Sequence, residues 1–157
     1  MNKILLFVAM CVLAIPTMAH DRGFYSLGYE KVNLRAGPAK RFPIKWVYQE
    51  KHYPVEVIDS FEDWCQVREA DGTIGWMYSD KLKNVRYVVI QEEDKLLSTP
   101  SVSGKVIAYV QPGVLGRLES CPEGDYCLLQ FTHEDKKIEG WFPRRFVWGL
   151  YDGEVVE

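Results

Sequence analysis

The side chains of this 157-residue chain that could support covalent chemistry are its cysteines and histidines. Cys65 could act as a nucleophile with His133 as its base, the pairing that cysteine peptidases use. Cys65 lies inside a predicted strand, however, where we expect it to be buried. None of the histidines has metal-ligand spacing with a cysteine or an acidic residue, and a glycine-rich phosphate loop is absent from the sequence. The sequence therefore predicts no metal site and no cofactor, and offers little support for catalysis.

Two further cysteines, Cys121 and Cys127, flank the turn-forming residues 122–125. A turn at this position folds two strands back on each other and brings the two Cβ atoms within disulfide range. We therefore predict a Cys121–Cys127 disulfide that pins one hairpin and contributes on the order of 2 kcal/mol. Cys65 has no cysteine across its own turn, so we expect a buried free thiol or, alternatively, an intermolecular disulfide.

The first nineteen residues have the three parts of a secretory signal peptide: Lys3, the apolar run 4–15 and the small-residue site Thr17-Met18-Ala19. The apolar run would span about 18 Å as a helix, which is short of a bilayer core of roughly 30 Å. We predict cleavage between Ala19 and His20, and a periplasmic or secreted protein without stable membrane insertion. This compartment allows disulfides to persist.

Short, β-branched or aromatic segments bounded by turn residues predict strands almost throughout the chain. Examples are 55–58, 65–68, 74–77, 86–90, 106–110, 126–131 and 138–141. No segment of helical length carries an apolar stripe with a 3.6-residue period. The fold class is therefore all-β. A formal net charge of −3 with scattered basic residues leaves no electrostatic footprint for nucleic acid.

Short motifs recur along the chain at a nearly constant spacing. An offset of 62 residues relates Leu34 to Leu96, Pro38 to Pro100, Trp64 to Tyr126 and Cys65 to Cys127. The Gly75-Trp76 pair recurs three residues late, as Gly140-Trp141, which we attribute to a longer, charged loop over 132–137 in place of a two-residue Asp-Gly turn in 70–73. Such a period indicates two copies of one small folding unit.

A constant offset fails at one strand, where Val55 and Val57 would align with charged residues. Because a one-residue slip moves every side chain to the other face, we align Val55 with Gly116 and Val57 with Leu118.

The motif Asn33-Leu34-Arg35-Ala36-Gly37-Pro38, followed by Asp63-Trp64 and Gly75-Trp76, resembles the bacterial SH3-like domain. The second copy departs from the first motif and retains Asp125-Tyr126-Cys127 and Gly140-Trp141. The resemblance implies two tandem small barrels of about five strands each, and no catalysis. We place a lead-in at 20–29, the first domain at 30–90 and the second at 91–157.

Four residues of the first unit are candidate ligand contacts: Arg35, Phe42, Trp46 and Tyr48. Trp46 and Tyr48 share a strand face beside the 35–42 loop and could form a shallow aromatic groove for an extended peptide. Alternatively, these aromatic side chains belong to the core of a small domain. Arg35 could bind a carboxylate, or be solvated or paired with a neighbour such as Glu30.

The resemblance points to a non-catalytic exported module that recognises a cell-envelope ligand, either a peptidoglycan stem peptide or an extended protein peptide. A structural or scaffolding protein of the periplasm, bound to a periplasmic protein, is the alternative. A cysteine peptidase acting on peptidoglycan is more remote: such enzymes carry SH3-like domains, but their catalytic part is a separate α/β domain, for which this chain has no residues left over.

Overall fold

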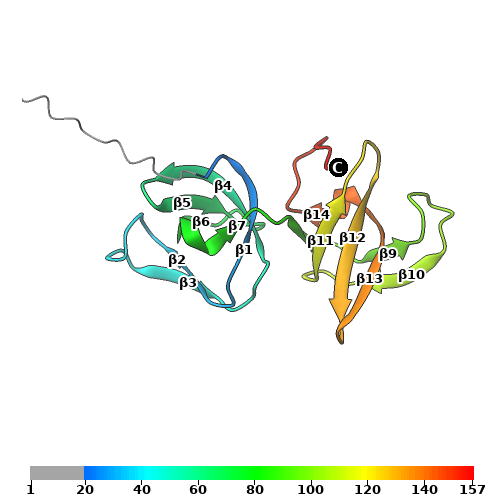
Figure 1. The fold of residues 1–157 in the computed structure, drawn as a ribbon, viewed down its shortest axis with the longest axis horizontal. Helices are drawn as coiled ribbons and strands as arrows, with labels where there is room; N and C mark the ends of the chain where they lie inside the picture. Colours follow the sequence, from blue (N-terminus) through cyan, green and yellow to red (C-terminus); the bar gives the residue numbers. More distant parts are fainter. Residues whose placement is uncertain (1–19) are drawn as a thin grey trace, which may run out of the picture.

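The structure is a computed structural model that describes residues 20–157. It consists of two seven-stranded antiparallel sheets, one in each half of the described chain, each curved into a small barrel (Figure 1). The all-β prediction of two SH3-like barrels is confirmed, although each sheet has seven strands where about five were expected. The predicted signal peptide, with the cleavage site after Ala19, lies outside the described residues.

The first barrel has the strand order β3-β2-β6-β5-β4-β1-β7. Its strands, with the short 3₁₀ turn η1, are β1 (Gly23–Leu27), β2 (Val32–Arg35), β3 (Ile44–Tyr48), β4 (Pro54–Phe61), β5 (Trp64–Arg68), β6 (Ile74–Tyr78), η1 (Ser79–Lys81) and β7 (Leu82–Lys83).

The second barrel repeats this order as β10-β9-β13-β12-β11-β8-β14. Its elements are β8 (Tyr87–Ile90), β9 (Asp94–Leu97), β10 (Val106–Val110), β11 (Leu115–Ser120), β12 (Tyr126–His133), β13 (Lys136–Pro143), η2 (Arg144–Phe146) and β14 (Val147–Trp148).

The boundary between the two sheets lies between Lys83 and Tyr87, earlier in the chain than the expected division at 90/91. Strand β8 pairs with β11 and β14 and so belongs to the second sheet. Strand β1 lies in the expected lead-in 20–29, yet it pairs with β4 and β7 of the first sheet. Residues 91–93, just after the expected division, connect β8 to β9 within the second sheet.

Both barrels carry irregularities at equivalent places. The β2–β3 and β9–β10 pairs each shift register, around Lys45 and Ile107. The β4–β5 and β11–β12 pairs each shift after Val57 and Leu118, respectively. The structure therefore confirms the predicted equivalence of Val57 and Leu118. A bulge inserts one extra residue into the strand, bends it and increases its local twist.

The glycine of each Gly-Trp motif allows close approach of two strands. A Cβ on Gly75 would lie 2.5 Å from Leu34 Cγ and 3.0 Å from the Arg35 carbonyl oxygen. In the second barrel, a Cβ on Gly140 would lie 2.7 Å from Leu96 Cγ. The glycine recurs because β6 pairs with β2, and β13 with β9, at this contact.

The β12–β13 hairpin, which precedes the second Gly-Trp pair, does not contain the longer loop that we expected over 132–137. The β12–β13 ladder runs as far as His133 and Lys136, so the loop is the tight pair Glu134-Asp135, both with positive φ. In the first barrel β5 and β6 are shorter and are joined by a turn at Gly72, in which the Gly72 N–H donates to the Glu69 carbonyl and the Glu69 N–H to that of Thr73. Longer strands, and not a longer loop, therefore account for the displacement.

Each barrel buries its own apolar core. Trp64 and Cys65 are buried in the first barrel, whereas Trp76 is half-buried. The second barrel contains the predicted Cys121–Cys127 disulfide, whose Cα atoms lie 4.2 Å apart. Cys65 is a buried free thiol, as predicted.

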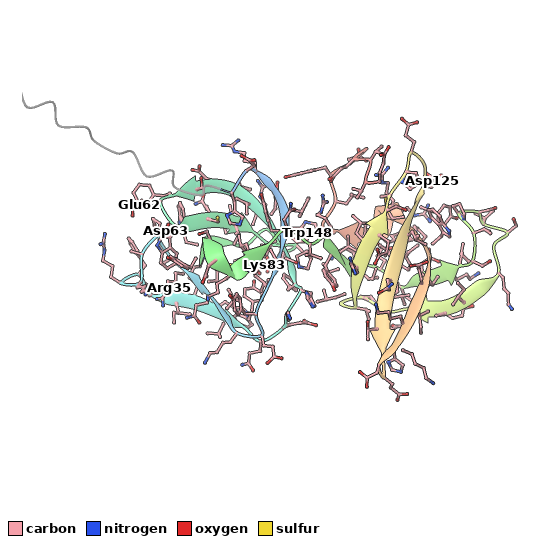
Figure 2. All side chains as sticks on the ribbon, in the orientation of Figure 1. Arg35, Glu62, Asp63, Lys83, Asp125 and Trp148 are labelled. Carbon is pink, nitrogen blue, oxygen red and sulfur yellow. A yellow bond between two sulfur atoms is a disulfide. The ribbon has the colours of Figure 1, made fainter. Side chains whose placement is uncertain are left out.

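Aromatic side chains pack between the barrels. The Phe24 ring centroid lies 5.1 Å from that of Trp148, which Figure 2 labels at the junction, and 4.8 Å from that of Tyr151. His52 stacks on Tyr87 at 4.3 Å. The two barrels therefore pack directly against each other.

Candidate functional site

Two of the predicted ligand residues, Arg35 and Phe42, shape their own loop. The Arg35 guanidinium donates from Nη1 to the carbonyl oxygens of Lys40 and Phe42, at 3.0 and 2.9 Å. The Phe42 ring covers Gly37, where a Cβ would lie 2.7 Å from two ring carbons. The loop conformation thus accounts for both the arginine and the glycine of the motif. Arg35 also borders a small cleft together with Lys31, Lys40, Trp64 and Tyr78.

The other two, Trp46 and Tyr48, line a common groove of ≈ 840 Å³ on the first barrel. They lie on β3, opposite the buried residues Leu34 and Val32 of β2. Trp46 is 63% exposed on the edge strand β3, whereas Tyr48 is only 7% exposed because it packs into the core of the first barrel. The structure therefore brings Trp46 and Tyr48 together, and leaves Arg35 and Phe42 outside the residues that line this groove.

The sequence did not predict the opposite wall of the groove. Glu69, Asp71 and Thr73 contribute this wall from the β5–β6 loop, and Tyr53 from the connection between β3 and β4. The turn signal around Gly72 was visible in the sequence, but nothing in its spacing indicated that the turn faces β3. The Lys45 side chain reaches from β3 to the start of β6, where its ammonium donates to the Ile74 carbonyl oxygen at 2.7 Å.

Negative charge dominates the groove. Its lining includes one basic residue, Lys45, and three acidic ones, Glu50, Glu69 and Asp71. Burial raises the pKa of Tyr53, and the carboxylates of Glu69, Asp71 and Glu50 raise it further. Burial also raises the pKa of Tyr48, and Glu69 raises it further. Glu69 therefore acts on both tyrosines of the groove.

Tyr48 and Glu69 both line the groove as neighbours, and each has one buried polar atom without a hydrogen bond of ordinary geometry. Among the described residues, neither Tyr48 Oη nor Glu69 Oε1 has a partner, although both atoms are buried. Burial raises the pKa of Glu69, and the neighbouring Tyr48 hydroxyl and Lys45 partly offset that effect. Asp71 is held differently: its Oδ1 accepts a hydrogen bond from the Thr73 N–H at 2.8 Å, and this bond lowers its pKa.

The second barrel has no equivalent constellation at this position. Its register places Ala108 where the first barrel has Trp46, and Val110 where it has Tyr48. Phe131, in the extended β12 strand, takes the place of Glu69 and packs into the core. A Cβ on Gly116 would lie 2.8 Å from the Phe131 ring, so an aromatic side chain fills this region.

Cys65 is poorly suited to nucleophilic chemistry. It is 1% exposed, and burial raises its pKa to about 11, so the thiol is protonated at neutral pH. His133, its proposed base, lies at the tip of β12 in the other barrel. The structure does not bring the two residues together as a catalytic pair.

Residues 28–84 match the family model of the bacterial SH3 domain. The matched segment covers the first barrel from the residue after β1 to the residue after β7, and it contains every residue that lines the groove. A comparison with curated proteins gave no match.

Solved structures similar to the chain include NlpC1 and NlpC2 of Trichomonas vaginalis, each 14% identical with a TM-score of 0.36. The alignments cover 89% and 82% of this chain but only 50% and 48% of those two chains, so this chain spans about half their length. Similarity at this level supports no functional inference.

Residues 20–157 contain no helix of the length and apolarity that crossing a membrane requires. Within the same range, no three histidine, cysteine or acidic side chains are grouped as a metal site would need.

Proposed function

We propose that this protein is a non-catalytic, exported binding module whose first barrel recognises an extended peptide of the cell envelope. The peptide would be a peptidoglycan stem peptide or a segment of a periplasmic protein. The observation that carries the proposal is the groove itself, which combines an exposed tryptophan with buried polar atoms that have no hydrogen-bond partner within residues 20–157. Such convergence of aromatic surface and unsatisfied polar groups is typical of ligand sites.

Strand β3 provides a further reason to expect an extended ligand. It ends the sheet, so its outer edge has no neighbouring strand in the described chain. A peptide can add to such an edge through main-chain hydrogen bonds while alternate side chains enter a pocket. Trp46 would then be the aromatic anchor of the interaction.

Export is supported by the Cys121–Cys127 disulfide, because disulfides persist in oxidising compartments. A cysteine peptidase is disfavoured by the burial and raised pKa of Cys65.

The test is calorimetric titration with purified sacculi fragments and with synthetic stem peptides. We expect Trp46→Ala to weaken binding by at least about 10-fold, as for an aromatic anchor. Tyr109→Ala is the matched control, since Tyr109 is 62% exposed on β10, the edge strand of the second barrel. The proposal is wrong if wild-type protein binds no fragment, or if both variants bind as the wild type does.

A scaffolding role is the second candidate, and it is favoured by apolar residues on β10. Val106, Ile107 and Tyr109 are all exposed on this edge strand. Light scattering and crosslinking in envelope preparations would distinguish the two: a scaffold forms a stable protein complex through β10 and binds no peptide in the groove.

A further inference from the structure

The electrostatics of the groove on the first barrel restrict the chemistry of its ligand. Three of its four charged lining residues are acidic. The one basic group, the Lys45 ammonium, is already engaged with the Ile74 carbonyl oxygen. A cationic group on the ligand would therefore meet a net negative field, whereas a carboxylate would be repelled.

Two residues that line the groove add specific acceptors to this field. Tyr48 is more than nine-tenths buried, and its Oη has no hydrogen-bond partner in the described chain. Glu69 Oε1 is likewise buried without a partner. A buried carboxylate oxygen that has no donor is costly, and a donor supplied by a ligand would lower that cost.

Aromatic rings flank these acceptors. The Tyr48 and Tyr53 rings lie 5.3 Å apart, and Trp46 exposes most of its indole at the mouth of the groove. Aromatic faces attract cations, and indole does so most strongly. Carboxylates and aromatic rings that line one groove form a site that is suited to an ammonium group.

We propose that this groove binds a primary ammonium group of the peptide ligand, with the Glu69 carboxylate as its main acceptor and Tyr48 Oη as its second. An ammonium carries three N–H donors, so it can satisfy both atoms at once. The proposal rests on the proposed peptide-binding function and adds the chemical class of the group that is recognised.

The second barrel provides an internal contrast. Phe131 occupies the place of Glu69, and Val110 that of Tyr48, so the acceptors are absent there. Ammonium recognition is therefore a property of the first barrel alone.

An ammonium could come from the peptide N-terminus or from the side chain of a lysine or other diamino acid. The test uses one synthetic stem tripeptide whose third residue is a diamino acid, prepared in four forms: free, acetylated at the N-terminus, acetylated on the side chain, and acetylated at both. Calorimetry with the full chain measures the affinity of each form. We expect the doubly acetylated peptide to bind at least about 10-fold more weakly than the free one, and the singly acetylated forms to identify which amine is bound.

Variants of the acceptors complete the test. Glu69→Gln and Tyr48→Phe should each weaken binding of the free peptide and leave binding of the doubly acetylated peptide unchanged. Glu119→Gln is the matched control, because Glu119 is another half-buried carboxylate, located on β11 outside the groove. Tyr48→Phe removes a single oxygen, so it keeps the test decisive even if Glu69→Gln alters the loop.

The outcomes separate the two proposals. Equal affinity for all four peptides would overturn ammonium recognition and leave peptide binding in place. No binding of any form would overturn peptide recognition of this class, and with it the ammonium site.

Discussion

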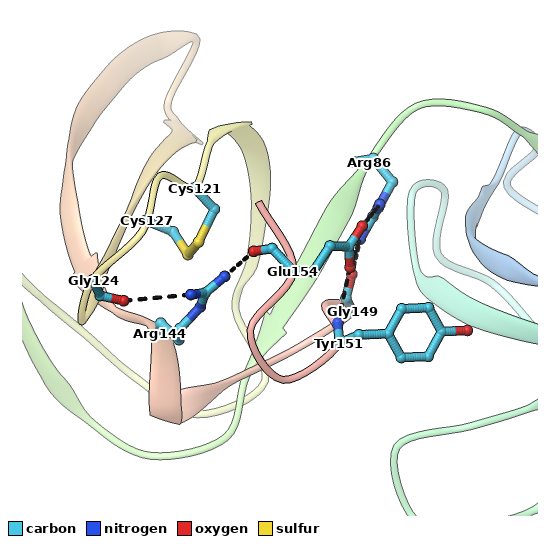
Figure 3. Close-up of a disulfide and its surroundings, with 8 residues drawn as sticks. All are labelled: Arg86, Cys121, Gly124, Cys127, Arg144, Gly149, Tyr151 and Glu154. Atoms are coloured by element: carbon cyan, nitrogen blue, oxygen red, sulfur yellow. Dashed lines mark hydrogen bonds and ion pairs between the residues drawn. A yellow bond between two sulfur atoms is a disulfide. The ribbon is translucent and has the colours of Figure 1, made fainter. Parts of the chain in front are cut away.

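Arg86 and Glu154 form a bidentate ion pair that ties the C-terminal tail (149–157) to the segment between the barrels (84–86). Arg86 Nη1 lies 2.6 Å from Glu154 Oε1, and Nη2 lies 3.2 Å from Oε2 (Figure 3). The same guanidinium donates to the Gly149 carbonyl oxygen at 2.8 Å, and the Tyr151 N–H donates to Glu154. Tyr151 then reaches the first barrel, where its hydroxyl donates to Glu56 at 3.1 Å.

This network predicts that the tail fixes one barrel against the other. Glu154→Gln should lower the free energy of unfolding by about 1 kcal/mol, the upper range for a partly exposed pair. It should also broaden the amide resonances of β1 and β8, the strands that meet the tail and linker. Unchanged melting temperature and spectra for this variant would show that the tail is a passive contact.

Acid should loosen the same contact. Burial raises the pKa of Glu154, but the hydrogen bonds from Arg86 and the Tyr151 N–H, with the charges of Arg86 and Arg144, outweigh it and lower the pKa overall. Because the pKa of Glu154 is lowered in the folded state, its carboxylate contributes stability that is fully present above the ordinary pKa of 4.5. This contribution is lost as pH falls from 4.5 through the lowered pKa. The stability difference between wild type and Glu154→Gln should therefore shrink in melts recorded below that pH. A stability difference at pH 3 as large as the one at pH 7 would contradict an ionic origin.

The disulfide should stabilise the second barrel locally. Cys121 exchanges two backbone hydrogen bonds with Val156, so the disulfide also anchors the tail. Replacing both Cys121 and Cys127 by serine should cost about 2 kcal/mol of stability, as expected for a short loop. Hydrogen exchange should then rise in 121–127 and 149–157 and stay unchanged around Trp46. Cys65→Ser, which removes no disulfide, controls for the substitution of a thiol.

Glu69 should show a trade-off between stability and binding. Burial raises the pKa of Glu69, which means that ionising this carboxyl destabilises the folded state. The folded protein therefore loses stability as pH rises from the ordinary carboxyl pKa through the raised pKa of Glu69. The groups that face it are Tyr48, Tyr53, Asp71 and Lys45. Glu69→Gln should therefore be at least as stable as wild type at pH 7 while binding the free-amine peptide more weakly. A clear loss of stability at pH 7, measured by thermal unfolding, would show instead that the carboxylate is needed for the fold.

Much of the fold follows from local signals in the sequence. The Gly-Trp pairs, the 62-residue period and the cysteines around 122–125 predicted the barrels and the disulfide, because strand approach, register and turn chemistry are encoded within a few residues. The division between the units was harder to predict. Tyr87–Ile90 looks like the end of one unit, and only its pairing with β11 and β14 assigns it to the next.

The site was predicted in part for a similar reason. Trp46 and Tyr48 lie on one strand, so their shared face follows from the two-residue period. Glu69 and Tyr53 reach the groove from other elements, and their proximity depends on tertiary packing. Arg35 is a conspicuous residue in the motif, but its guanidinium serves the backbone of its own loop.

The most direct test of the account is an NMR titration of the ¹⁵N-labelled protein with the free-amine stem tripeptide. The account predicts chemical-shift changes concentrated at Lys45–Glu50, Tyr53 and Glu69–Thr73, and none at the equivalent positions Ala108, Val110 and Phe131. Shifts concentrated on the second barrel, or in the Lys31–Lys40 cleft with the groove unchanged, would contradict it.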